Sequence, residues 1–271
     1  MKYIIIYSVI IGLVSNCYSQ SKIQKAENSL SRSERVSFRN QDDDDDDGGD
    51  FFVDNFDGVI LEAFMYLTYY TLIETPFEMQ HQTSQAPLTP YPYKNSKKGN
   101  YTFSPEDEYS RFRTEISSRY ISENNAIKGM NVTLDMRFLK RIGIALDYHQ
   151  LWERNLNFGN DHLAFYNLLA KYYRIRTENM DAWWGIGTTY VDGNVNQFGF
   201  TYGLGTELFF AKPLSLEINF DQTLINSETV NKFNVLLNYH ISKYKAIGGY
   251  NHLKIGTQHF SSVTLGVGVI F

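Results

Sequence analysis

Histidine and serine side chains offer the most obvious chemistry in this sequence. The six histidines are His81, His149, His162, His240, His252 and His259. They form no HExxH motif and no close pair, which is the spacing that a zinc site needs. Nucleophilic catalysis by serine needs a histidine beside the hydroxyl and an acid that orients the histidine. His259 with Ser261 or Ser262 comes nearest to such a pair, but the spacing identifies no orienting acid. We therefore interpret these residues as ordinary loop polarity, and we expect no catalytic site, no metal site and no cofactor.

Two further patterns could bind ions or phosphates. Asp42 to Asp47 are six consecutive carboxylates, and carboxylate oxygens are ligands for calcium. The run lacks the ligand spacing of a folded calcium loop, so its self-repulsion favours a solvated chain. The glycines of TYGLGTE and GVGVIF alternate within strand-like runs. Because no helix follows them, they predict no phosphate loop.

Charged side chains of both signs form a third pattern, because they alternate with apolar residues. They are Arg113, Glu115, Arg119, Asp135, Arg137, Glu217 and Asp221. Charges withdrawn from water need partners of opposite sign or hydrogen bonds. We interpret these residues as ion pairs in the interior of a barrel rather than as a selectivity filter.

Strands with a period of two would position these charges. In QFGFTYGLGTELFF, which spans residues 197–210, large apolar residues fill most even positions, and Gly, Thr and Glu fill most odd ones. Such alternation is typical of a strand with two different faces. Ten such runs lie near residues 111–122, 128–138, 141–152, 162–173, 180–191, 196–210, 213–225, 230–241, 244–255 and 260–271. The first and ninth alternate poorly, so eight strands remain an alternative.

The connections between the runs suggest an up-and-down barrel. Those after the second, sixth and eighth runs are tight, whereas those near 153–161, 191–196, 226–229 and 256–259 are longer and polar. This asymmetry is typical of short periplasmic turns and longer external loops.

Composition excludes several classes of protein. A chain of 271 residues has room for one barrel-sized domain and an appendage. Its net charge of −5 provides no basic field for nucleic acid. The single cysteine, Cys17, excludes a disulfide framework.

The first residues have the layout of a secretory signal peptide. Lys2 precedes an apolar stretch from Tyr3 to Val14 and a small polar exit. Cys17 and Ser19 are small residues at the −3 and −1 positions for cleavage before Gln20, which gives a signal peptide over residues 1–19. The rival interpretation is lipidation of Cys17 at a lipobox, although Asn16 stands where Gly or Ala is usual. Either route carries the chain across the inner membrane of a Gram-negative cell.

Two segments separate this leader from the barrel. Residues 20–50 are polar and end in the aspartate run, which predicts a disordered acidic linker. Residues 51–110 form an N-terminal extension with an apolar segment at 58–73, which could be an interfacial helix, a strand or a small packed core. Five of the six prolines lie between Pro76 and Pro105, so we place the domain boundary there, with the barrel over 111–271.

Periodicity alone does not say which face of the strands is outside. A soluble ligand-binding barrel would show the same period with the faces reversed. The polar positions are mostly Gly, Thr, Ser and Asn, residue types that fit a crowded interior. Large rings fall near the ends of the runs, as in the aromatic girdles of membrane barrels; they include Tyr148, Trp152, Tyr172, Trp184, Tyr190, Tyr239 and Phe271. We therefore expect the apolar face to contact lipid.

The last run, SSVTLGVGVIF, places Val263, Leu265, Val267 and Val269 at every second position before the terminal Phe271. It resembles the C-terminal signature of bacterial outer-membrane β-barrel proteins. The resemblance implies an all-β fold, an up-and-down antiparallel transmembrane β-barrel of eight to ten strands, located in the outer membrane with its N-terminal extension in the periplasm. It also implies that the barrel assembly machinery recognises Val267, Val269 and Phe271.

Side chains can largely fill a barrel of this strand number, which disfavours a wide pore. The leading hypothesis is a non-enzymatic barrel with a structural, anchoring or interaction role in the cell envelope. Its partners would be outer-membrane lipid, the assembly machinery and a possible periplasmic partner of the extension, and not nucleic acid. The alternatives are a narrow channel or small-solute transporter, a soluble ligand-binding barrel, and a lipid-modifying enzyme of the outer membrane.

Overall fold

The computed structural model describes residues 21–31, 87–94, 99–102, 110–138, 141–155, 159–226 and 228–271. The predictions for the signal peptide, the aspartate run and the apolar segment at 58–73 lie outside these residues. Within the described part of the chain, no helix is long and apolar enough to cross a membrane.

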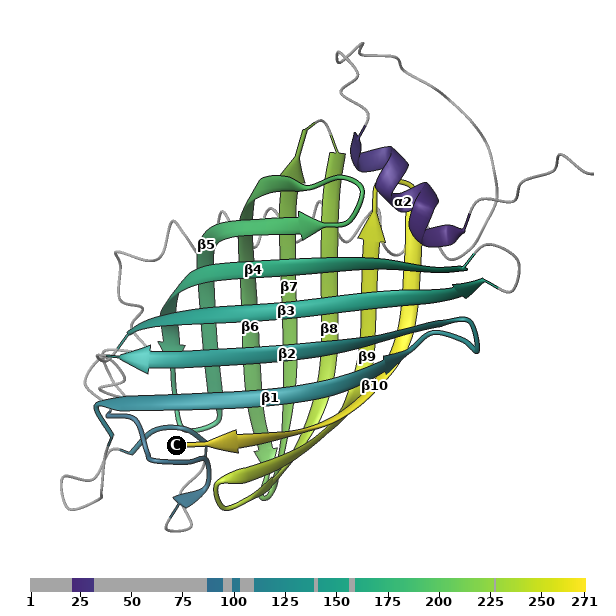
Figure 1. Cartoon of the computed structure of the whole chain (residues 1–271). Coiled ribbons are helices and arrows are strands. Elements are labelled where there is room, and N and C mark those ends of the chain that lie inside the picture. The colour runs from purple at the N-terminus through teal and green to yellow at the C-terminus, as the bar shows by residue number, and fades with distance from the viewer. Residues whose placement is uncertain are drawn as a thin grey trace, which may run out of the picture.

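Ten antiparallel strands close into a barrel (Figure 1), in which each strand pairs with its neighbours in sequence and β1 pairs with β10. They are β1 (Phe112–Ser122), β2 (Ile127–Phe138), β3 (Ile142–Asn155), β4 (Gly159–Arg176), β5 (Met180–Asp192), β6 (Gln197–Ala211), β7 (Leu214–Ile225), β8 (Glu228–Ile241), β9 (Tyr244–Ile255) and β10 (Gln258–Ile270). All ten predicted runs are strands, so ten is confirmed and the eight-strand alternative is wrong. The ninth run alternates poorly because Ile247 points inward while Gly248 lies on the outer face.

The apolar face of the strands is the outer face of the barrel. Phe200 is 53% exposed, whereas its neighbour Thr201 is fully buried inside. The same alternation leaves Leu237, Leu265 and Val267 exposed on other strands. An outer wall of this kind needs an apolar solvent, which lipid provides. The soluble-barrel alternative is therefore wrong.

Aromatic rings form two groups on the outer wall. Tyr148, Tyr166, Tyr190 and Phe198 pack in sequence across β3 to β6, with ring centroids 4.9, 6.3 and 4.7 Å apart. Tyr172 and Trp184 form a second group with centroids 5.9 Å apart. Amphipathic rings at these positions suit the two membrane interfaces.

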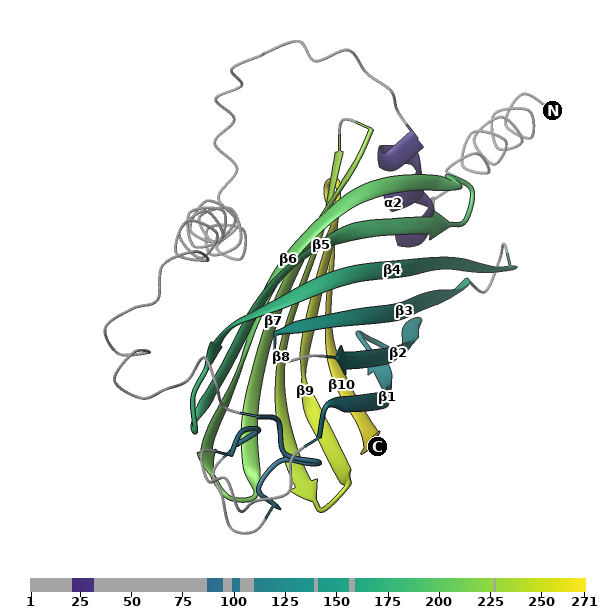
Figure 2. The ribbon, with the colours of Figure 1, turned by 90° about the vertical axis from the view of Figure 1, so that its left-hand side faces the viewer.

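The barrel has two ends, which we name the C-terminal end and, after the helix α2 (Lys22–Ser31), the α2 end. β1 begins and β10 ends at the C-terminal end, and Figure 2 shows the C-terminus there, at the bottom of the view. Every connection between consecutive strands has two to four residues. The predicted difference between short turns and long loops is therefore wrong, and connection length does not say which end faces outward.

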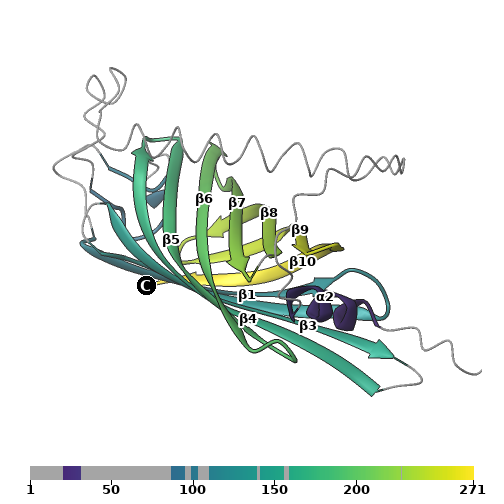
Figure 3. The same ribbon diagram turned by 90° about the horizontal axis from the view of Figure 1, so that it is seen from above.

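A helix that the sequence did not predict occupies the α2 end. This helix, α2, spans Lys22–Ser31 and lies at the opposite end of the barrel from the C-terminus (Figure 3). The prediction of a disordered linker is thus wrong for residues 21–31. It failed because the helix owes its stability to the barrel wall that buries one of its faces, and only tertiary packing makes so short a helix stable.

The other described part of the N-terminal region lies at the C-terminal end. Leu88 forms isolated β-bridges with Tyr101 and Ser110, just before β1 begins. α2 therefore lies at one end of the barrel, and residues 87–94 and 99–102 lie at the other. In a barrel that crosses a membrane they cannot both face the periplasm. The periplasmic location of the extension, residues 51–110, stays a prediction.

Candidate functional site

The inward side chains of the strands enclose a charged chamber. Its free space is about 100 Å³, measured as the volume open to the centre of a water molecule. A water molecule takes up about 30 Å³ in the liquid, so this space holds only a few of them and side chains fill most of the interior. All seven charged residues singled out in the sequence line this chamber: Arg113, Glu115, Arg119, Asp135, Arg137, Glu217 and Asp221.

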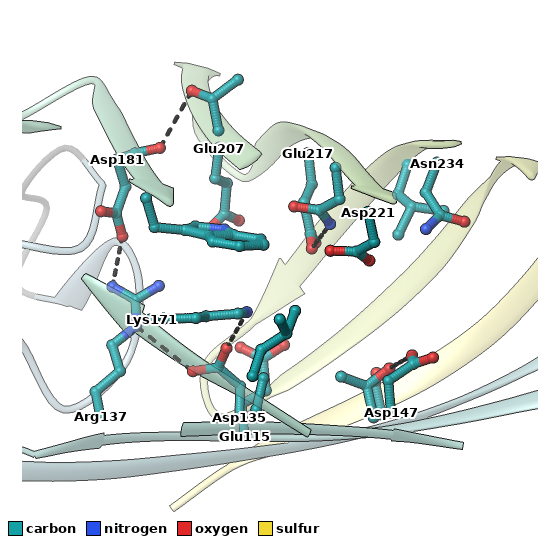
Figure 4. A pocket seen from close by; sticks show the side chains of 18 of the residues that line it. Glu115, Asp135, Arg137, Asp147, Lys171, Asp181, Glu207, Glu217, Asp221 and Asn234 are labelled. Atoms are coloured by element: carbon teal, nitrogen blue, oxygen red, sulfur yellow. Dashed lines mark hydrogen bonds and ion pairs between the residues drawn. The ribbon is translucent and has the colours of Figure 1, made fainter. Parts of the chain in front are cut away.

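A chain of alternating charges crosses the chamber wall near the C-terminal end (Figure 4). Arg137 Nη1 lies 2.5 Å from Asp181 Oδ2, and Lys171 Nζ lies 2.6 Å from Asp135 Oδ2. Arg137 also joins the two pairs, because its Nε lies 3.9 Å from Asp135 Oδ1. The guanidinium stacks on the Tyr173 ring, 3.9 Å from its centroid. Removal of one charge would leave a buried partner uncompensated.

Further ion pairs connect strands on different sides of the chamber. Lys232 of β8 pairs with Asp147 of β3, and Lys245 of β9 pairs with Glu115 of β1. Lys245 Nζ also lies 3.7 Å from Glu217. Six other charged residues of the chamber were missing from the predicted set of seven: Asp147, Lys171, Asp181, Glu207, Lys232 and Lys245. Lys232 falls at one of the even positions of β8, which point inward, so the alternation of β8 would have indicated it. Lys245 was harder to find because β9 alternates poorly.

Residues 87–94 and 99–102 cover the C-terminal end of the chamber. Tyr101 donates a hydrogen bond to Asp181 Oδ1 at 2.9 Å, and Asn100 Nδ2 donates to Asp181 Oδ2 at 3.2 Å. Arg113 Nη1 in turn donates to Asn100 Oδ1 at 3.0 Å. Burial, followed by the charge of Asp181, raises the pKa of the Tyr101 phenol well above its usual value. The phenol is therefore neutral at physiological pH and remains a hydrogen-bond donor.

Tyr93 fixes the same segment to β7. Its hydroxyl donates to the carbonyl oxygen of Leu214, and its ring packs edge-on against Phe209, with centroids 5.6 Å apart. Burial, followed by the charge of Glu207, raises the pKa of Tyr93 to about 12. Neutral donors thus hold the extension against the barrel rim.

The opposite end of the chamber is apolar, and α2 closes it. Ile23, Ala26 and Leu30 of α2 are fully buried. They pack inside a set of inward side chains that we call the apolar ring: Ile127, Leu151, Leu163, Phe165, Val191, Val195, Ile225, Val230, Leu253, Ile255 and Phe260. The expectation of a polar interior is therefore wrong at this end, because the strands carry apolar residues inward where they meet the helix.

Polar groups of the barrel satisfy both ends of α2. At its N-terminus, Glu153 accepts a hydrogen bond from the Ile23 amide at 2.9 Å, where the helix dipole favours an anion. At its C-terminus, Asn226 Nδ2 donates to the Leu30 carbonyl at 2.8 Å. Unpaired backbone groups at helix ends need such partners when water is excluded.

A carboxylate of the helix itself adds a third polar attachment. Glu27 accepts hydrogen bonds from the backbone amide and the side-chain amide of Asn194, at 2.8 and 2.6 Å. Lys22 also forms an ion pair with Glu123 at 2.6 Å. The barrel therefore recognises α2 through polar groups at several points as well as through the apolar ring.

The interpretation of His259, Ser261 and Ser262 as loop residues is wrong, because all three lie in β10. Ser261 lies beside His252, with Oγ 2.9 Å from Nδ1, and Ser262 donates to the carbonyl oxygen of Asn251. A second contact joins Ser215 Oγ to His240 Nε2 at 2.8 Å, but Ser215 is fully buried. The absence of enzymatic activity stays a prediction.

No model of a protein family matches the sequence, and no curated protein matches it. Several solved structures are similar. The "KdgM porin" is 12% identical with a TM-score of 0.39, and the match covers 58% of this chain and 99% of the porin. An outer membrane channel from Pseudomonas putida F1 is 10% identical with a TM-score of 0.39, with 63% and 100% covered. The Yersinia pestis outer membrane protein Ail is 15% identical with a TM-score of 0.34, with 59% and 99% covered. These likenesses concern the barrel fold alone.

Proposed function

We propose that this chain is a closed barrel of the outer membrane with a structural and anchoring role, which holds two parts of its own N-terminal region at opposite membrane surfaces. The docking of α2 inside the apolar ring carries this proposal. A helix whose apolar face is fully buried and whose two ends are both bonded to the barrel is a fixed part of the protein.

The C-terminal strand suggests the orientation of the barrel. From its resemblance to outer-membrane barrels we infer that the C-terminal end faces the periplasm. Residues 87–94 and 99–102 would then lie on the periplasmic side, where a partner can reach them, and α2 would lie at the cell surface. On the outer wall, Val267 and Phe271 are exposed and Val269 is half-buried on the same face, so the three can serve as the signal for the barrel assembly machinery.

A conductance measurement tests the anchoring role. The full chain is refolded and inserted into planar bilayers, and a known porin confirms that channels are detectable. We expect no conductance steps, because ion pairs and two covering segments obstruct the interior. Steady, resolved steps from the full chain would contradict the proposal.

A narrow channel is the second candidate, because the charged chamber lies between two coverings, one of which is a single short helix. The variant Ile23→Asp/Leu30→Asp, which cannot bury α2, separates the two candidates. A channel closed by α2 would conduct only in this variant. An anchoring barrel would conduct in neither form.

A further inference from the structure

The carboxylates of the chamber outnumber its cations, and one carboxylate lacks a partner. Six Lys and Arg residues and seven Asp and Glu residues line the cavity. Asp221 forms no ion pair among the described residues, and its buried Oδ1 has no hydrogen-bonding partner there. An unpaired carboxylate held away from water is costly unless a cation or proton compensates it.

The nearest cation on the wall is already engaged. Lys232 is the direct cross-strand neighbour of Asp221 in the β7–β8 ladder. Its ammonium group nevertheless reaches across the chamber to Asp147. Lys232 thus pairs with only one of the two carboxylates, and the negative charge of Asp221 remains at this part of the wall. Figure 4 shows Asp221 and Asp147 on opposite sides of the cavity.

Neutral groups that also lack partners line the same space. A small cavity of about 20 Å³, measured as above, is bordered by Asp147, His149, Asn167, Asp221 and Lys232. His149 is 1% exposed, and neither ring nitrogen has a hydrogen-bonding partner among the described residues; Asn167 is 8% exposed, and its Oδ1 has none. A space of this size holds about one or two water-sized particles.

The backbone provides room for these groups. A Cβ atom built on Gly203 of β6 would lie 2.2 Å from Asp221 Oδ1. Gly203 therefore lets the carboxylate of the next strand lie against the β6 backbone. Any larger residue at position 203 would have to displace it.

We propose that this cavity binds one monovalent cation, either an alkali ion or an ammonium group, through Asp221, Asn167 and His149. A carboxylate oxygen, an amide oxygen and the lone pair of a neutral imidazole are the acceptors that such a cation needs. One positive charge balances the single excess carboxylate, whereas a divalent ion would leave an excess of positive charge. Within the described residues, no three His, Cys, Asp or Glu side chains are grouped to hold a metal ion, which also disfavours a divalent site.

Direct binding tests the proposal. The full chain is refolded with radiolabelled thallous ion, which substitutes for potassium, so that the ion can enter before α2 closes the barrel. We expect about one ion per barrel in the unmodified chain and none in Asp221→Asn. Asp192→Asn, a half-buried carboxylate near the α2 end, is the matched control and should still bind one ion. Asn167→Ala changes no charge and should bind more weakly, so the test does not depend on one variant.

Stability in different salts provides an independent measurement. At constant ionic strength, the folded form should resist unfolding better in sodium, potassium or ammonium chloride than in chloride salts of N-methylglucamine, which is too large for the cavity. At ten times the dissociation constant, the ratio of unfolded to folded protein should fall roughly tenfold. The preferred salt distinguishes an alkali ion from ammonium. If no ion binds and stability is the same in all salts, Asp221 is neutralised by a proton and the proposal is wrong.

Discussion

Replacing Arg137 by glutamine should destabilise the barrel by about 3–5 kcal/mol, the usual cost of removing one partner from a buried ion pair. Asp181 is 2% exposed, and without the guanidinium it would lose its ion pair and keep the hydrogen bonds from the neutral donors Tyr101 and Asn100. Asp135 would lose its second cation but keep Lys171. Glutamine retains most of the volume of arginine, so the charge is the main quantity that changes.

Urea unfolding in detergent measures this effect as a lower midpoint and a smaller free energy of unfolding. Arg111→Gln is the matched control, because Arg111 is exposed just before β1, and surface changes typically stay within about 0.5 kcal/mol. The double variant Arg137→Gln/Asp181→Asn removes both charges and should recover a large part of the loss. Equal midpoints for Arg137→Gln and the unmodified chain would show that this pair does not stabilise the barrel.

Replacing Leu30 by aspartate should release α2 while leaving the barrel folded. Leu30 is fully buried in the apolar ring, and burial of a leucine side chain is worth about 1.5–3 kcal/mol. The loss should raise the population of undocked helix roughly 10- to 100-fold, and cleavage of an open segment follows that population. Trypsin would then cut faster after Lys22 and Lys25, which mass spectrometry detects.

The control for this variant lies on the same helix. Asn28 is exposed, so Asn28→Asp introduces the same charge without touching the apolar ring and should be cut at the unmodified rate. If Leu30→Asp and Asn28→Asp are cut equally slowly, α2 does not depend on the apolar ring for its place.

The strands and their two faces could be predicted because lipid and interior impose a strict period of two. Phe200 and Thr201 are adjacent in sequence yet face opposite environments, and the residue types alone indicate this. Seven of the charged side chains that line the chamber were predicted from the same alternation of apolar and polar residues. The pairing of the chamber charges was not predicted, because Lys232 passes over its neighbour Asp221 to reach Asp147, and only the closed barrel brings β8 and β3 face to face.

α2 could not be predicted from its own residues, although a signal was present. Ile23, Ala26 and Leu30 share one helical face, but a polar ten-residue segment near an aspartate run has little helical stability alone. The matching signal lies far along the chain, where Leu163 and Phe165 carry apolar side chains inward near the start of β4. The apolar face of the helix and the inward apolar residues of β4 pack against each other only in the closed barrel.

Spin labelling tests most directly the central claim, that the apolar wall of this barrel faces lipid and its charged wall faces the interior. Nitroxide labels are placed singly on cysteines at Phe200 and Leu237 of the outer wall and at Thr133 and Thr206 of the chamber, with Cys17 replaced by serine, and the protein is reconstituted in lipid vesicles. We expect frequent collisions with oxygen, which concentrates in the bilayer, at the two outer positions, and few collisions with oxygen at the two inner ones. Frequent collisions with a water-soluble nickel chelate at Phe200 and Leu237 would contradict the account.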